Sequence, residues 1–449
     1  MGFTERLQEV KTGFQSSFWV ANISELFERL AYYGQQAVLA IFLSEQLHFS
    51  QQQTGDLIGY FGFVVWFLPI LGGTLADRFG FRRALASAYM ILAFGYFLMG
   101  SLASPWMAPI RNSLPLYWVV LIVLMVPAMG PSVVKPCVVG TTGLAASENV
   151  RSLGYSIYYT LVNVGGMLGP IVAFTIRRSI GIENVFRVSA LSVLLMFFAT
   201  LFFFKEPKVG SEKKAASIAA ALTNMFKVLA NFRFMLFLLI FSGFWVVFWQ
   251  EFIALPLFIR RYISPNGNVD LWIATDAGAV MALQIIVTYA TRKIKAVPAI
   301  ILGIVVSSLS WVALALHPRS HTLAAGTEKV LSWVNIHTTI DAAAPMVIIA
   351  LVILALGEMI QSPRYYEYVS RLAPKGQQGT YMGYAFLPIG IGFLIGGATG
   401  GRLAHHFGDV VHQPQRMWWI ISAIGFLTAA LMLIYNKVIR PAESENVAS

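Results

Sequence analysis

The amino-acid sequence predicts an all-α membrane protein with twelve transmembrane helices arranged in two six-helix bundles. Three features of the 449-residue chain lead to this prediction: 57% of the residues are hydrophobic, only 12% are Asp, Glu, Lys or Arg, and the mean hydropathy is +0.68. Soluble domains carry about 25% charged residues, so a soluble globule is excluded. Long apolar runs are typical of membrane-spanning helices, which need roughly 20 residues each, and not of the alternating strands of a membrane barrel.

Charged clusters, prolines and glycines divide the chain into twelve apolar segments long enough to cross a bilayer as helices. The predicted spans are 17-45, 54-77, 83-103, 114-145, 153-176, 185-204, 232-262, 270-291, 297-317, 344-372, 379-404 and 416-438. The polar stretch 205-231 predicts a cytoplasmic linker between an N-terminal bundle, 1-204, and a C-terminal bundle, 232-449. Part of this linker, Ala215 to Ala230, is compatible with an amphipathic helix on the membrane surface. Between the ninth and tenth spans, we expect a short helix around Lys329 to Asn335.

The positive charge of the chain lies in the short loops between its apolar segments. A net charge of +11 would suit a nucleic-acid-binding protein, but the cations gather in loops such as the one with Arg78, Arg82 and Arg83. Loops rich in Lys and Arg mark the cytoplasmic side of a membrane protein. We therefore predict a multi-pass protein of the cell (cytoplasmic) membrane, with both termini cytoplasmic and no nucleic-acid partner. The single cysteine, Cys137, permits no internal disulfide and no cysteine-based metal cluster.

The first predicted span carries many polar residues for a membrane helix. They recur at helical spacing and form one stripe about 16 Å long. The stripe consists of Glu25, Glu28, Arg29, Tyr32, Tyr33 and Gln36. Lipid cannot satisfy such groups, so the stripe must face protein or water. Arg29 keeps its proton and needs an anion nearby, which leaves one of the two carboxylates available to titrate. The alternative is an inert Glu–Arg pair that locks two helices together.

Two further charges fall inside predicted spans, where an ionisable group costs about 2.5–3.5 kcal/mol. Lys135 has no acid within its own span, so we expect its partner on another helix or on a substrate. The adjacent Pro136 frees a backbone carbonyl and permits a bend. Glu358, in the tenth span, has no cation beside it on its helix and is a candidate functional residue.

Other acids within the spans have a structural interpretation. Glu367 lies three positions after Arg364 and four before Arg371, which predicts a structural ion-pair cluster near the cytoplasmic end. Glu251 in the seventh span and the isolated Asp276 in the eighth span are explained equally well by function and by helix-end or interhelical contacts.

The predicted charge layout suits a zwitterionic solute. Arg29 and Lys135 belong to the first half of the chain, and Glu358 belongs to the second. A cavity that is positive on one wall and negative on the other would hold a carboxylate near the cations and an amine near Glu358. The surplus carboxyl groups can carry protons, because burial favours the neutral form of a carboxyl group.

These residues also carry a family resemblance. The segment Gly73 to Arg83 resembles the loop signature between helices 2 and 3 of the major facilitator superfamily. Glu25 to Gly34 resembles the first-helix motif of the proton-coupled oligopeptide transporter (POT/PTR) family within it. Further segments resemble that family in order along most of the chain: Lys135-Pro136, Tyr158-Tyr159 through Asn163 and Pro170, Phe244-Trp245 with Gln250, and Gly357-Glu358 to Ser362-Pro363.

The resemblance implies a major facilitator fold and proton-coupled symport of small peptides or related zwitterionic solutes by alternating access. It assigns proton coupling to Glu25, Glu28 and Arg29. It places Arg29, Tyr33, Lys135, Asn163, Trp245, Gln250 and Glu358 around the substrate, and gives gating or structural roles to Asp77, Arg78, Pro136 and Pro363. Trp249 stands where many members of the family have a carboxylate, and Glu251 lies two positions further on.

A proton-driven exporter (antiporter) of drugs or metabolites is the alternative function. Its support is the segment Gly165 to Pro170, which resembles a glycine-proline motif of antiporter relatives, although small residues also permit ordinary close helix packing. An enzyme is not expected. His405, His406 and His412 lie with Asp409 in a predicted outer loop and lack the spacing of a metal motif. We expect no metal and no cofactor, protons and a small peptide-like molecule as partners, membrane lipids around the chain, and a monomer.

Overall fold

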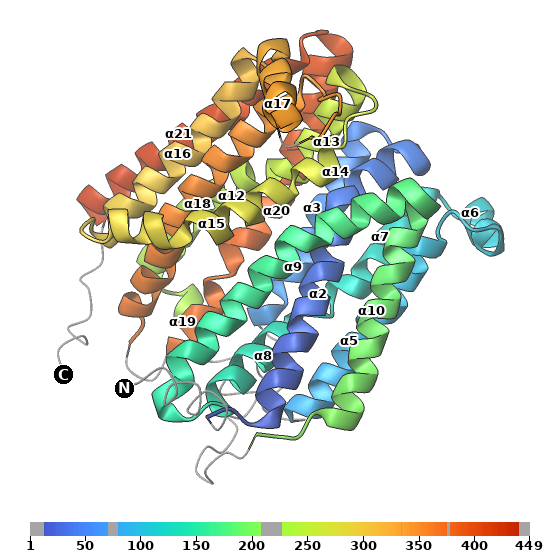
Figure 1. Cartoon of the computed structure of the whole chain (residues 1–449). Coiled ribbons are helices and arrows are strands. Elements are labelled where there is room, and N and C mark those ends of the chain that lie inside the picture. Colours follow the sequence, from blue (N-terminus) through green and yellow to red (C-terminus); the bar gives the residue numbers. More distant parts are fainter. Residues whose placement is uncertain (1–12, 71–79, 208–226, 334, 375–377, 440–449) are drawn as a thin grey trace. The chain divides into compact units, whose positions relative to one another are not determined.

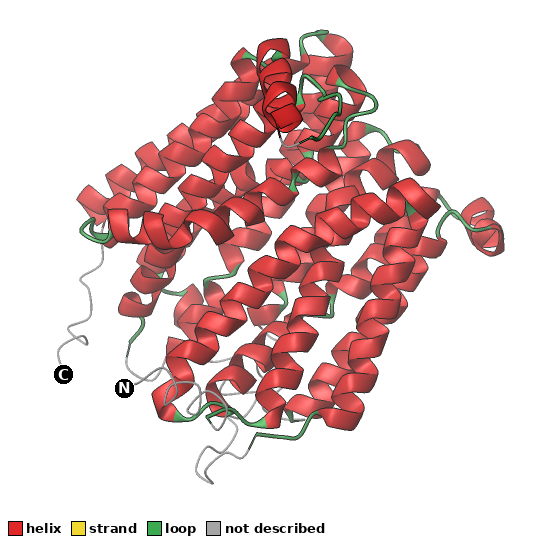
Figure 2. Ribbon diagram, in the orientation of Figure 1, coloured by secondary structure: helices red, strands yellow, loops and turns green. Residues whose placement is uncertain are grey.

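The computed structural model of the protein describes residues 13–70, 80–207, 227–333, 335–374 and 378–439. Helices dominate these residues (Figures 1 and 2), and the only strand-like pairing among them is an isolated bridge between Phe14 and Ala146. Contacts within the chain divide it into two compact units. The first unit comprises Met1–Gln35 and Val64–Met225, and the second comprises Gln36–Phe63 and Phe226–Ser449.

The first unit consists of α2, of which it includes the part up to Gln35, and of six further helices in the part of the chain that the structure describes. Its helices are α2 (Ser16–Ile41), α5 (Phe81–Ser101), α6 (Ala108–Ser113), α7 (Leu116–Ala128), α8 (Pro131–Leu144), α9 (Arg151–Ile180) and α10 (Glu183–Phe203). The predicted fourth span, 114-145, is interrupted between α7 and α8. Pro127 lies inside α7 and Pro131 begins α8, and proline cannot continue the hydrogen bonding of a helix.

The second unit contains most of α3 and all helices after the linker. They are α3 (Gln51–Phe67), α12 (Phe232–Phe248), α13 (Ala254–Phe258), α14 (Val269–Trp272), α15 (Ala274–Thr291), α16 (Ala296–Leu316), α17 (His321–Trp333), α18 (Ala344–Leu372), α19 (Gln378–Tyr384), α20 (Leu387–Ala404) and α21 (Met417–Ile434). The short helix expected around Lys329 is α17, which begins eight residues earlier than Lys329.

Ten helical segments of the described residues are long and apolar enough to cross a membrane. The first two predicted spans are not among them. Helix α2 carries three charged residues, Glu25, Glu28 and Arg29, and the described part of α3 has 17 residues. The end of the second predicted span, 71–77, lies outside the described residues, as does most of the predicted linker with the segment 215–226.

Small residues bring the helices that carry polar side chains close to their neighbours. On α9, a Cβ atom added at Gly165 would lie 2.7 Å from Cβ of Arg29, and one at Gly169 would lie 2.7 Å from the carbonyl oxygen of Leu30. In the second unit, a Cβ atom at Gly303 of α16 would lie 2.5 Å from the carbonyl oxygen of Gly357 on α18. Close packing through small residues is the usual way in which membrane helices associate. It accounts for Gly165 and Gly169 in the segment Gly165 to Pro170.

Candidate functional site

The acids and the arginine of α2 form a buried ionic cluster in the first unit. Glu25 and Glu28 are 0% exposed and Arg29 is 2% exposed. The Nε atom of Arg29 lies 3.3 Å from Oε1 of Glu25, and its guanidinium donates hydrogen bonds to Oε2 of Glu28. Oε2 of Glu25 and Oε1 of Glu28 have no hydrogen-bond partner within the described residues. One guanidinium therefore serves two carboxyl groups, and an oxygen of each remains able to accept a proton.

Lys135 joins this cluster from α8. It lies near enough to Glu25, Glu28 and Arg29 for their charges to interact. Its ammonium nitrogen lies 3.6 Å from the ring centroid of Trp66, a cation–π contact. With all four groups ionised, Glu25, Glu28, Arg29 and Lys135 carry a net charge of zero.

The tyrosines of the polar stripe extend the cluster along α2. Tyr32 is 0% exposed, and its ring lies 5.2 Å from Cζ of Arg29. Tyr33 is half-buried and packs edge-on against Tyr32, and its hydroxyl interacts electrostatically with Arg29. Gln36 is buried as well. Asn163 of α9 is half-buried, and its amide donates to the carbonyl oxygen of Tyr159 in its own helix at 3.0 Å.

The predicted aromatic and amide residues of the seventh span lie in the second unit, where its helix is interrupted. Helix α12 ends at Phe248 and is followed by a 3₁₀ turn at Trp249–Glu251. Trp245 stacks on Trp249, and Trp249 stacks on Phe393 of α20 with the ring centroids 3.9 Å apart. Many members of the POT/PTR family have a carboxylate at this position. In this chain the position is occupied by Trp249, whose ring is part of an aromatic stack.

Gln250 is fixed by its contacts with α20. Its amide nitrogen donates to the carbonyl oxygens of Val246 at 2.7 Å and of Gly396 at 3.1 Å. Gly396 and Gly400 both face Gln250, and a side chain at either position would meet its amide group. Gln250 is 0% exposed. These contacts indicate a structural role, in addition to any contact with a substrate.

Three acids that the sequence treats separately come together in the second unit. Glu251 and Asp276 are buried, Glu358 of α18 is half-buried, and their carboxyl groups lie near enough for their charges to interact. Asp276 stands at the beginning of α15, which packs along α18. The sequence contains no signal for this arrangement, because the three residues belong to three different spans.

The remaining predicted residues have defined positions or lie outside the described residues. Glu367 pairs with Arg364 at 2.8 Å and with Arg371, which confirms the predicted ion-pair cluster. Pro136 lies inside α8 and Pro363 lies inside α18. The predicted gating residues Asp77 and Arg78 fall within 71–79, outside the described residues.

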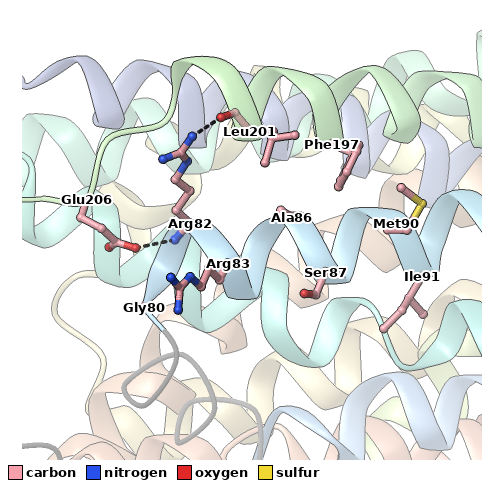
Figure 3. Close-up of a pocket in the computed structure, with 10 residues that line it drawn as sticks. All are labelled: Gly80, Arg82, Arg83, Ala86, Ser87, Met90, Ile91, Phe197, Leu201 and Glu206. Carbon is pink, nitrogen blue, oxygen red and sulfur yellow. Dashed lines mark hydrogen bonds between the residues drawn. The ribbon is translucent and has the colours of Figure 1, made fainter.

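The loop after α10 contributes a residue that the sequence did not single out. At the N-terminus of α5, Oε1 of Glu206 accepts a hydrogen bond from the backbone amide of Arg82 at 2.8 Å (Figure 3). Oε2 of Glu206 accepts one from the amide of Phe81 at 3.2 Å. The Arg82 guanidinium donates to the carbonyl oxygen of Leu201. A carboxylate at this position satisfies free helix amides and the helix dipole. Arg82, Leu201 and Glu206 line a pocket between α5 and α10 together with the apolar side chains of Met90, Ile91 and Phe197.

A second polar network in the second unit centres on Asp409. Its carboxylate accepts hydrogen bonds from Tyr262 at 2.7 Å, from Gln51 at 3.1 Å and from Arg261 at 3.2 Å, and lies 3.0 Å from Nδ1 of His405. These contacts account for Asp409 and His405 as structural residues. Nearby, Arg402 pairs with Asp56 of α3 at 2.7 Å.

Comparison with known proteins agrees with this architecture. A family model described as Major Facilitator Superfamily matches residues 22–340, more than half of the chain. The chain belongs to the Major Facilitator Superfamily. This membership makes it a multi-pass membrane protein of a transporter family.

Members of the superfamily resemble the chain over nearly its whole length. The multidrug resistance protein MdtH of Sodalis glossinidius (strain morsitans) is 22% identical over 409 residues, which cover 91% of this chain and 90% of that protein. The protein of the same name from Salmonella paratyphi B (strain ATCC BAA-1250 / SPB7) is 21% identical, with 87% of each chain covered.

Solved structures of POT family transporters share the fold. One in complex with a thioalcohol conjugated peptide gives a TM-score of 0.73 at 16% identity, and one in complex with 5-aminolevulinic acid gives 0.71 at 15%. In both comparisons, 94% of this chain and 96% of the other chain are covered. The fold that the resemblance to the POT family implied is therefore present in this Major Facilitator Superfamily chain.

Proposed function

We propose that this chain is a proton-coupled secondary transporter that carries small peptides or related zwitterionic solutes into the cell by alternating access. The observation that supports this most is the burial of Glu25 and Glu28 with Arg29 and Lys135. Guanidinium and ammonium groups are the natural ligands of a carboxylate. A substrate carboxylate would add one negative charge to a cluster whose formal charges sum to zero.

Charge balance then couples the substrate to a proton. An uncompensated charge is costly in the interior of a membrane protein. When a substrate carboxylate binds to Arg29 and Lys135, the cluster regains neutrality if Glu25 or Glu28 takes up a proton. The unpartnered oxygens Oε2 of Glu25 and Oε1 of Glu28 are available for that proton. Binding of the substrate and of the proton therefore favour each other.

We assign the rest of the substrate-binding residues from the same chemistry. Glu358 would pair with the substrate amine, and Trp245 and Tyr33 would supply aromatic surface. Asn163 and Gln250 would supply amide groups. A POT family structure contains a conjugated peptide and another contains 5-aminolevulinic acid, both of which fit a site for an amine and a carboxylate.

At the level of the whole chain, we propose twelve spans. The two that complete the set would be α2 with its polar stripe and α3 with the segment that follows it. The bundles would be 1-204 and 232-449, joined by the cytoplasmic linker 205-231, in the cell membrane with both termini cytoplasmic. We further propose a monomer surrounded by lipid, with Asp77 and Arg78 in a loop that controls opening and with Pro136 and Pro363 as bending points.

A proton-driven exporter is the second candidate. Its support is the similarity to proteins named multidrug resistance protein MdtH, which extends over 91% of this chain at 22% identity. An exporter would exchange an outgoing solute for incoming protons. Its substrates would not need the free carboxylate that Arg29 and Lys135 suit.

Proteoliposomes with an acidic exterior distinguish the two functions. The proposed importer accumulates a labelled dipeptide inside the vesicles, and a protonophore abolishes the accumulation. An amidated dipeptide, which lacks the carboxylate, should accumulate several-fold less. An exporter would show no accumulation of dipeptide, and would accumulate a cationic drug inside vesicles that expose the cytoplasmic face and are acidified inside. The absence of any dipeptide movement in either direction would refute the importer.

A further inference from the structure

Three carboxyl groups of the second unit lie within electrostatic range of one another. Glu251 belongs to the 3₁₀ turn after α12, Asp276 to the first turn of α15 and Glu358 to the middle of α18. The charge of Glu251 interacts with those of Asp276 and Glu358, and the charge of Asp276 interacts with that of Glu358. The two helices α15 and α18 pack against each other, which keeps Asp276 and Glu358 on facing elements.

Two of these side chains are almost fully buried and incompletely hydrogen-bonded. Glu251 is 1% exposed and Asp276 is 9% exposed. Oε2 of Glu251 and Oδ1 of Asp276 have no hydrogen-bond partner among the described residues. An unpartnered polar atom in the interior costs about 1–3 kcal/mol, and more when it is charged. Glu251 therefore lies buried within electrostatic range of Asp276 and Glu358, and none of the described cations forms an ion pair with its carboxyl group.

The arginines described on the helices and turns of the second unit have other partners. Arg260 pairs with Glu45 at 2.7 Å and interacts with Asp270 of α14, and Arg261 pairs with Asp409. On α18, Arg364 and Arg371 pair with Glu367, and on α20, Arg402 pairs with Asp56. At the far end of α15, Arg292 lies over the ring of Tyr289. Among the described residues of the second unit, no Lys, Arg or His forms an ion pair with Glu251, Asp276 or Glu358.

A metal ion does not account for the three acids. No group of three His, Cys, Asp or Glu side chains within the described part of the chain is close enough to hold one. Three carboxylates that repel one another in a membrane interior cannot all remain ionised, because both burial and like charge favour the neutral form. Protonation of individual carboxyl groups relieves this repulsion, so we infer that a proton is the ion that binds here.

We propose that Glu251 and Asp276, beside Glu358, form a second proton-binding site in the second unit, distinct from Glu25 and Glu28. This inference rests on the proposed function, and it names where a further proton is held. An ammonium group that binds at Glu358 would stabilise the negative charge of that carboxylate. Glu358 would then be the ionised member, while Glu251 and Asp276 keep their protons.

The test uses infrared spectroscopy of the purified full-length protein in detergent at neutral pH, without substrate. The proposal predicts a C=O band of buried protonated carboxyl groups, and this band should shift when the solvent is exchanged for D₂O. Glu251→Gln and Asp276→Asn should each remove the intensity of about one carboxyl group from the band. Glu148→Gln, which changes an exposed carboxyl group in a loop of the first unit, should leave it unchanged.

The variants are close to isosteric, and size-exclusion elution together with circular dichroism shows whether they are folded. If Asp276→Asn does not fold, the loss of band intensity in Glu251→Gln tests the proposal. Glu251→Asp keeps a carboxyl group and should retain the band. A band that is identical in the wild type, Glu251→Gln and Asp276→Asn would overturn the proposal. Because no substrate is present, this outcome is independent of the dipeptide experiment, which can succeed or fail separately.

Discussion

The ammonium nitrogen of Lys135 lies 3.6 Å from the centroid of the Trp66 ring. A desolvated cation–π contact contributes about 0.5–2 kcal/mol. We predict that Trp66→Leu, which removes the ring, weakens the binding of a dipeptide by roughly 2- to 30-fold, because Lys135 loses the contact that positions it. Isothermal titration calorimetry in detergent measures this effect.

The matched control for this substitution is Trp118→Leu. Trp118 belongs to the same unit but is 58% exposed, so its loss should leave the affinity unchanged. Trp66→Phe keeps an aromatic face and should lie between the wild type and Trp66→Leu. If Trp66→Leu and Trp118→Leu bind the dipeptide equally well, the Trp66 ring does not position Lys135 for the substrate.

The two acids of α2 should be required for energy coupling more than for movement of the substrate. In Glu25→Gln or Glu28→Gln, the cluster can no longer exchange a proton at that position. We predict that both variants lose proton-driven accumulation of a dipeptide by at least tenfold but retain counterflow exchange at equal pH on both sides. Glu148→Gln is the control with an exposed carboxyl group and should behave like the wild type. Accumulation that persists in both variants would place the proton elsewhere.

Close packing between α2 and α9 should be sensitive to a single added carbon. A Cβ atom at Gly169 would lie 2.7 Å from the carbonyl oxygen of Leu30 and 2.8 Å from the amide nitrogen of Gly34, so the backbone must shift. Overpacking of this kind costs about 1–3 kcal/mol. We expect Gly169→Ala to lower the apparent melting temperature by several degrees. Gly326→Ala meets nothing within 4 Å and should leave it unchanged or raise it slightly.

Glu206 should stabilise the start of α5. Its carboxylate accepts hydrogen bonds from the amides of Phe81 and Arg82. Loss of such a cap typically costs about 0.5–2 kcal/mol. We predict that Glu206→Ala lowers the apparent melting temperature and accelerates hydrogen exchange at the first turn of α5, whereas Lys205→Ala has neither effect. Equal exchange rates in the two variants would show that the contact does not stabilise the helix.

Most of the architecture could be predicted from local sequence patterns. Apolar segments of about 20 residues identify membrane helices, because the hydrocarbon core has a fixed thickness. Apolar length alone does not describe two of the helices. Helix α2 carries Glu25, Glu28 and Arg29, and the fourth predicted span, which is one apolar segment from Leu116 to Leu144, is divided into α7 and α8 near Pro127 and Pro131. Residues 36–63 belong to the second compact unit together with the second half of the chain. No local sequence pattern predicts this assignment. The bundle boundaries at 204 and 232 remain predictions.

The site could be predicted in part. The ion pair of Arg29 with Glu25 and the ion pairs of Glu367 follow from helical spacing, because partners three or four positions apart share one face. The contact of Lys135 with Trp66 and the grouping of Glu251, Asp276 and Glu358 join residues from different helices. Such pairings depend on the packing of helices in three dimensions. The single chain sequence contains no pattern that specifies them.

We propose that Arg29 and Lys135 bind the carboxylate of a zwitterionic substrate and that Glu358 binds its amine. Photo-crosslinking with two dipeptides, one with a diazirine in its first side chain and one in its second, tests this claim directly. Mass spectrometry of the labelled protein should find the second-residue probe on α2 or α8 and the first-residue probe on α12 or α18, both displaced by unlabelled dipeptide. Displaceable labelling of the same unit by both probes, or no displaceable labelling at all, would contradict the account.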